Sequence, residues 1–172
     1  MKKNHQINYP ANTDIIQSFV NIQESYPPLF DSYIDYPTVK AWLKQIRTEG
    51  FDHSMITEII AYIYRLKNTN REAEASLLLL VSASTEDKDA LYVLARELFK
   101  GTLFQTNYAA SFGIFTSLCK RGHPQATCDV ALFYKNGIIV EKDKQRATKL
   151  YQIAMNAGVN RAQKHYNTLM NR

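Results

Sequence analysis

The sequence contains few glycines and prolines, which interrupt helices, and few cysteines, which crosslink small domains through disulfide bonds. Its 172 residues include only 6 glycines, 5 prolines and 2 cysteines. Because glycine and proline disfavour helix interiors, their scarcity leaves room for long helices. Cys119 and Cys128 form no CxxC pair, and no histidine lies at zinc-ligand spacing from either. Free buried thiols are therefore favoured over a disulfide or a metal site.

Long apolar segments are also missing. The longest run, LLLLV at 77–81, is far shorter than the roughly 20 residues that a membrane-spanning helix needs. The first residues, MKKNHQINYPANTD, contain two lysines but no apolar stretch after them, unlike a secretory signal. We therefore expect a soluble, cytoplasmic protein.

The sequence motifs of common enzymes are absent as well. It contains no HExxH, GxSxG, GxGxxG or GxxxxGK[ST]. None of the four histidines has a potential metal-ligating or catalytic partner three or four residues after it; they are His5, His53, His123 and His165. The acidic clusters at 71–74 and 86–89 are expected at helix N-termini, where negative charge is favourable. We therefore predict a protein that is not an enzyme, with no cofactor, no metal ion and no small-molecule substrate.

Charge is distributed unevenly along the chain. Residues 1–87 contain 8 Lys or Arg against 11 Asp or Glu, a net charge of −3, whereas residues 88–172 contain 13 against 5, a net charge of +8. Four cations follow one another closely at Lys142, Lys144, Arg146 and Lys149. A solvated helix face is the favoured interpretation, and a surface for nucleic acid or another acidic partner stays open as the alternative.

What the sequence does contain is a repeat of 36 residues. Residues 90–125 align without a gap on residues 126–161. Identical small residues coincide at Ala90 and Ala126, Ala95 and Ala131, Gly101 and Gly137, and Gly122 and Gly158. A fixed period of this length is typical of stacked supersecondary units, and apolar residues three and four apart predict that each unit is a pair of helices.

The ends of these helices can be read from single residues. Gly101 and Gly137 are suited to end the first helix of each unit, because glycine adopts left-handed backbone angles without strain. Asn107 and Asp143 are good N-caps for the second helix. Between Gly137 and Asp143, we expect the apolar pair Ile139 and Val140 to pack into the groove between helices.

The first half of the chain repeats this pattern less clearly. Residues 54–66 and 69–84 predict a helix pair, with Thr69 and Glu72 at capping-box spacing. Before it, residues 36–50 and 12–26 predict two more helices. We therefore expect about nine helices and no sheet, with divergent helices over 1–53, a degenerate unit over 54–89, two clear units over 90–125 and 126–161, and a capping helix over 162–172.

The second clear unit resembles the Sel-one-like repeat (SLR), a relative of the tetratricopeptide repeat. The resemblance covers 126–162 clearly and 90–125 fairly, and it depends on Ala126, Val130, Ala131, Tyr134, Gly137, Val140, Asp143, Ala147, Tyr151, Ala154, Gly158 and Ala162. It implies an all-α fold, a right-handed α-solenoid of antiparallel helix pairs. Cysteine-rich members pair the position of Cys119 with that of Thr127, whereas here the second cysteine is Cys128.

The resemblance also implies a concave surface, lined by the first helix of each unit, that binds a partner. With Ala126, Val130 and Ala131 facing inward, the neighbouring positions would lie on the open side, unless another segment covers them. The predicted partner-binding residues are Tyr64, Arg96, Glu97, Asp129, Leu132, Phe133 and Asn136.

These expectations favour a non-catalytic module that binds one specific protein. It could be an adaptor, or a bacterial immunity protein that occupies a toxin or effector, a distinction that depends on size and family analogy alone. The alternative is a binder of nucleic acid or of an acidic surface through the basic C-terminal half.

Overall fold

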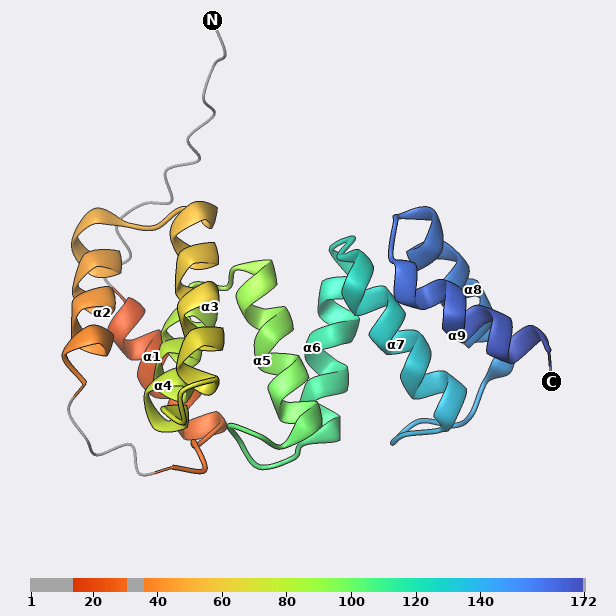
Figure 1. Cartoon of the computed structure of the whole chain (residues 1–172), viewed down its shortest axis with the longest axis horizontal. Coiled ribbons are helices and arrows are strands. Elements are labelled where there is room, and N and C mark those ends of the chain that lie inside the picture. The colour runs from red at the N-terminus through yellow and green to blue at the C-terminus, as the bar shows by residue number, and fades with distance from the viewer. Residues whose placement is uncertain (1–13, 31–35, 172) are drawn as a thin grey trace, which may run out of the picture. The chain divides into compact units, whose positions relative to one another are not determined.

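The computed structural model describes residues 14–30 and 36–171, and in these residues it contains nine α-helices and no strand (Figure 1). The helices are α1 (Ile15–Ser25), α2 (Pro37–Glu49), α3 (His53–Lys67), α4 (Glu72–Ala83), α5 (Lys88–Lys100), α6 (Tyr108–Lys120), α7 (Pro124–Asn136), α8 (Lys144–Asn156) and α9 (Asn160–Met170). An isolated antiparallel bridge joins Pro28 to Phe104. The prediction of about nine helices without a sheet is confirmed for this part of the chain. His5 and the first residues of the expected helix 12–26 lie outside the described residues.

The chain forms two compact units, an N-terminal unit of residues 1–106 and a C-terminal unit of residues 107–172. The N-terminal unit contains α1 to α5, and the C-terminal unit contains α6 to α9. The division falls between the two helices of the predicted repeat 90–125. The boundaries of the repeats themselves stay a prediction.

The helix ends follow the local signals of the sequence. Gly101 and Gly137 end α5 and α7 with left-handed φ angles of 71° and 70°. The side chain of Asn107 accepts a hydrogen bond from the amide of Ala110 at 2.9 Å and so caps α6. Asp143 caps α8 in the same way, with the amide of Arg146 at 2.8 Å.

Two predictions about loops are wrong. Ile139 does not pack between helices, because it is 54% exposed, and its φ angle is positive at 54°. Thr69 and Glu72 do not form a capping box, because that motif would make Thr69 the N-cap and Glu72 the third helical residue, whereas α4 begins two residues later, at Glu72 after Arg71. The hydroxyl of Thr69 instead donates to the carbonyl of Leu66 at the end of α3.

The core of the N-terminal unit is built around α4. This helix contacts α1, α2, α3 and α5, and every residue from 74 to 83 is buried. A helix that is covered on all sides has no need for a polar face. This arrangement accounts for the apolar run LLLLV, which lies within α4.

The core of the C-terminal unit lies where α7 packs against α6 and α8, and α8 packs against α9. Its cluster of buried residues includes Ala131, Ala147, Tyr151 and Ala162. Both cysteines are free thiols, as predicted. The hydroxyl of Thr127 donates to the sulfur of Cys119 at 3.3 Å, so a hydroxyl–thiol contact occupies the pair of positions that cysteine-rich SLR proteins are expected to bridge.

Candidate functional site

Tyr64, Tyr92 and Arg96 form a surface on two helices of the N-terminal unit, which we call the α3–α5 patch. Tyr64, on α3, is 49% exposed, and α3 contacts α5 (Figure 1). On α5, the guanidinium of Arg96 lies 3.5 Å from the hydroxyl of Tyr92, to which it donates. Partial burial raises the pKa of Tyr64, the charge of Glu97 raises it further, and the charge of Arg96 lowers it. The predicted site residues Tyr64 and Arg96 therefore belong to one local surface.

Glu97 does not belong to this exposed surface. Only 2% of it is exposed, so the prediction that it lies on the open side is wrong. Its carboxylate accepts hydrogen bonds from the ammonium of Lys67, at 2.5 Å, and from the hydroxyl of Thr102. Lys67 lies on α3, so this ion pair joins the two helices beneath the patch and holds them in register.

Asp129 plays a comparable structural part in the C-terminal unit, and its predicted exposure is also wrong. It is 4% exposed and is held by the guanidinium of Arg161 through two hydrogen bonds of 2.7 and 2.8 Å. The same guanidinium donates to the carbonyl and the side-chain oxygen of Gln125, at 2.9 and 3.1 Å. Arg161 thus links α9 to α7, and Asp129 is used within the fold.

Phe133 is fully buried, so its assignment to an open face is wrong as well. Its ring centroid lies 5.0 Å from that of Phe112 and 6.3 Å from that of Phe115. Both of these rings come from α6, the helix that precedes α7 in the chain. The neighbouring Leu132 is half-buried, and Asn136 is exposed.

The C-terminal unit has a basic surface around the loop that leads into α8. Lys142, Lys144, Arg146 and Lys149 are all exposed. The guanidinium of Arg146 lies over the ring of Tyr134, 4.3 Å from its centroid. Lys142 and Lys144 also line a hollow of about 280 Å³ together with Lys135 and Asn136 of α7 and two residues of α9. Of the predicted partner-binding residues, Asn136 therefore lies at this basic hollow.

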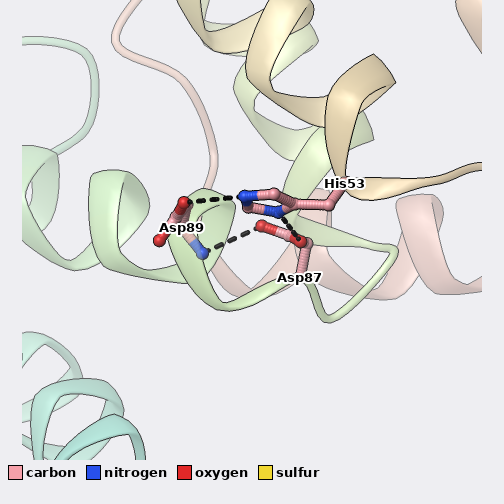
Figure 2. Close-up of side chains that lie close together, drawn as sticks. All are labelled: His53, Asp87 and Asp89. Atoms are coloured by element: carbon pink, nitrogen blue, oxygen red, sulfur yellow. Dashed lines mark hydrogen bonds and ion pairs between the residues drawn. The ribbon is translucent and has the colours of Figure 1, made fainter. Parts of the chain in front are cut away.

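The structure also assembles a cluster that the sequence analysis missed: His53, Asp87 and Asp89 (Figure 2). His53 is the first residue of α3, Asp87 is the N-cap of α5, and Asp89 lies in the first turn of α5. The Nδ1 of His53 lies 3.1 Å from a carboxylate oxygen of Asp87, and its Nε2 lies 3.4 Å from one of Asp89. The hydrogen bond to Asp87 is the main cause of a raised pKa of His53.

A signal for this cluster was present in the sequence. A search for partners three and four residues away cannot find a contact between helices, and Asp87 lies 34 residues from His53. The repeat period does indicate such a contact between helices, because a shift of 36 residues aligns His53 with Asp89. Equivalent positions in consecutive units of a helical repeat lie on neighbouring helices.

The fold as a whole is an all-α helical repeat of the solenoid class. Among solved structures, the chain is similar to a Sel1 repeat protein from Oxalobacter formigenes, with a TM-score of 0.57 and 19% sequence identity over 77% of this chain and 99% of that chain. The fold is therefore a Sel1-like helical repeat, as the sequence resemblance implied. No protein-family model and no curated protein matches the sequence.

Within residues 14–30 and 36–171, every helix is too short or too polar to cross a membrane.

Proposed function

We propose that this chain is a non-catalytic module that binds a protein partner, and that the α3–α5 patch is its main contact surface. The observation that carries the proposal is the half-exposed Tyr64, which lies within electrostatic reach of Arg96, while Arg96 donates a hydrogen bond to Tyr92. Tyrosine and arginine are the residue types, with tryptophan, that supply most binding energy in protein interfaces. Helical repeats of this class use such surfaces for binding.

The local structure supports this use of the patch. Arg96 is already oriented by the hydroxyl of Tyr92, and the ion pair between Lys67 and Glu97 fixes α3 against α5 below it. Side chains that are held in place before binding lose less conformational entropy when the complex forms. The patch therefore offers a half-exposed tyrosine and a cation at a low entropic cost.

For the partner itself, we propose one dedicated protein. Two clear repeats beside a divergent N-terminal half suit a single partner better than a general scaffold. A toxin or effector is one such partner, and the chain would then be an immunity protein. A component of a larger assembly is the other, and the chain would then be an adaptor.

The experiment is a pull-down from native lysate followed by affinity measurement with the captured protein. Tyr64→Ala or Arg96→Ala should weaken binding on the order of 30-fold, the equivalent of about 2 kcal/mol for an anchor residue. Tyr108→Ala is the matched control, because Tyr108 is 42% exposed but lies on α6 in the C-terminal unit. Equal losses for Tyr64→Ala and Tyr108→Ala would overturn the assignment of the patch.

A second candidate function is the binding of nucleic acid by the basic surface. Two observations favour this function: Lys142, Lys144 and Lys149 are exposed, and the guanidinium of Arg146 lies over the ring of Tyr134. Cations next to an aromatic ring suit the phosphate backbone and the bases of a single-stranded nucleic acid. Replacing the three lysines by glutamate should abolish a salt-sensitive association with nucleic acid and leave a complex at the α3–α5 patch intact. A protein partner lost from the lysine variant but kept by Tyr64→Ala would make the basic surface the working one.

A further inference from the structure

The distance between His53 and Asp89 in this cluster fits two ligands of one metal ion. A charge-assisted hydrogen bond between nitrogen and oxygen is usually about 2.7–2.9 Å long. The Nε2 of His53 and the carboxylate oxygen of Asp89 are 3.4 Å apart. In a tetrahedral zinc site, with bonds of about 2.0–2.1 Å to each ligand, neighbouring ligand atoms are about 3.3 Å apart. The two groups are thus separated as two ligands of one ion would be.

The third member of the cluster occupies the place of an orienting carboxylate. A histidine that binds a metal through one nitrogen usually donates its other N–H to a carboxylate or a carbonyl, which fixes the tautomer and the plane of the ring. In Figure 2, Asp87 lies at Nδ1 of the imidazole, at 3.1 Å, whereas Asp89 lies at Nε2. Asp87 is itself fixed, because its other oxygen accepts hydrogen bonds from the amides of Asp89 and Ala90 at 2.9 and 3.2 Å.

We propose that His53 and Asp89 bind a divalent metal ion of the zinc type, and that Asp87 orients the imidazole for it. One nitrogen and one carboxylate oxygen suit Zn²⁺ and Co²⁺, whereas Mg²⁺ and Ca²⁺ select oxygen ligands alone. The side chains of His53 and Asp89 are 65% and 49% exposed, so the ion enters from solvent and water molecules complete its coordination. The ion would connect the first residue of α3 to the first turn of α5. This site is independent of the proposed protein binding.

Proton and metal compete for the same nitrogen in this arrangement. The carboxylates that face His53 are Asp52, Asp87 and Asp89, and all three favour its protonated form. Because the metal needs the neutral imidazole, binding of Zn²⁺ releases a proton. Affinity therefore increases with pH as His53 is deprotonated.

The test is a titration of the full-length chain with Zn²⁺ by calorimetry, and with Co²⁺ by NMR of chain labelled at its histidine rings. We expect one site, with the Nε2 resonance of His53 shifted by the metal. His53→Gln and Asp89→Asn should abolish that site. Asp87→Asn should weaken it about 10- to 100-fold, as the loss of an orienting partner does. Asparagine can still cap α5, so this variant keeps the fold.

Asp143→Asn is the matched control, because Asp143 is also an N-cap aspartate but belongs to α8. It should leave the affinity for Zn²⁺ unchanged. Circular dichroism of each variant confirms that its helices are intact. The proposal is overturned if the wild type binds no Zn²⁺ at millimolar concentration, or if His53→Gln and Asp89→Asn bind it as the wild type does.

Discussion

Replacing Phe133 by alanine is the most direct test of how the C-terminal unit is packed. The ring is 0% exposed and lies within 5.0 Å of Phe112 and 6.3 Å of Phe115, centroid to centroid. Removal of a buried phenylalanine costs about 3–5 kcal/mol through lost burial and the cavity that remains. Two ring pairs would be lost with it, each worth about 0.5–1.5 kcal/mol beyond the area buried, and this favours the upper part of that range.

Urea denaturation followed by far-ultraviolet circular dichroism measures this loss. The fluorescence of Trp42, the single tryptophan, reports on the N-terminal unit, because Trp42 lies on α2. Ile153→Ala is the control: the side chain is 57% exposed on α8, and surface changes are usually within about 0.5 kcal/mol of neutral. A loss for Phe133→Ala as small as that of Ile153→Ala, together with loss of a binding partner, would refute the buried position and restore the open-face interpretation.

Three further predictions concern single positions. Gly101→Val should destabilise the fold by about 1 kcal/mol or more, because φ is 71° and an added Cβ would meet the hydroxyl of Thr106. Gly113→Ala is the control: Gly113 lies inside α6 with open space around it, so this change should be neutral or slightly stabilising in the same urea titration. Arg161→Ala should cost about 3 kcal/mol by removing the cation that pairs with the buried Asp129, and a melting temperature equal to that of the wild type would contradict this. The raised pKa of His53 means that the folded state binds its proton more tightly than the unfolded state, so the stabilisation is complete below the ordinary pKa of about 6.5 and is lost as pH rises through the folded value. The difference in melting temperature between wild type and His53→Gln, measured with a chelator present, should therefore be larger at pH ~5 than at pH ~8.5; a difference independent of pH would show that the ion pairs do not form.

Local signals in the sequence were sufficient to place most helix ends. Gly101 and Gly137, Asn107 and Asp143 each act within one turn of their own helix, so their roles depend on neighbours in the chain. The same signals failed at Ile139. Its positive φ is set by the whole loop, and β-branched residues adopt such angles rarely.

The candidate site was harder to predict because it depends on contacts between helices. The burial of Phe133 is caused by rings of α6, which no periodicity within α7 reveals. Glu97 and Asp129 were assigned to an open face because the small residues Ala126 and Ala131 were expected to face inward, and the same helix phase was applied one unit earlier. Each is buried here because a cation from a second helix, Lys67 or Arg161, reaches it.

The position of α4 has a consequence for how this protein could be altered or rebuilt. In many repeat proteins each unit contacts only its neighbours, so units can be deleted or duplicated while the remainder still folds. In the N-terminal unit, α4 is enclosed by α1, α2, α3 and α5 and has no polar face of its own. A truncation that removed α1 and α2 would leave a row of leucines facing water. The N-terminal unit therefore has to be expressed and engineered as one piece, and deletion or duplication of units in this chain has to begin after α5.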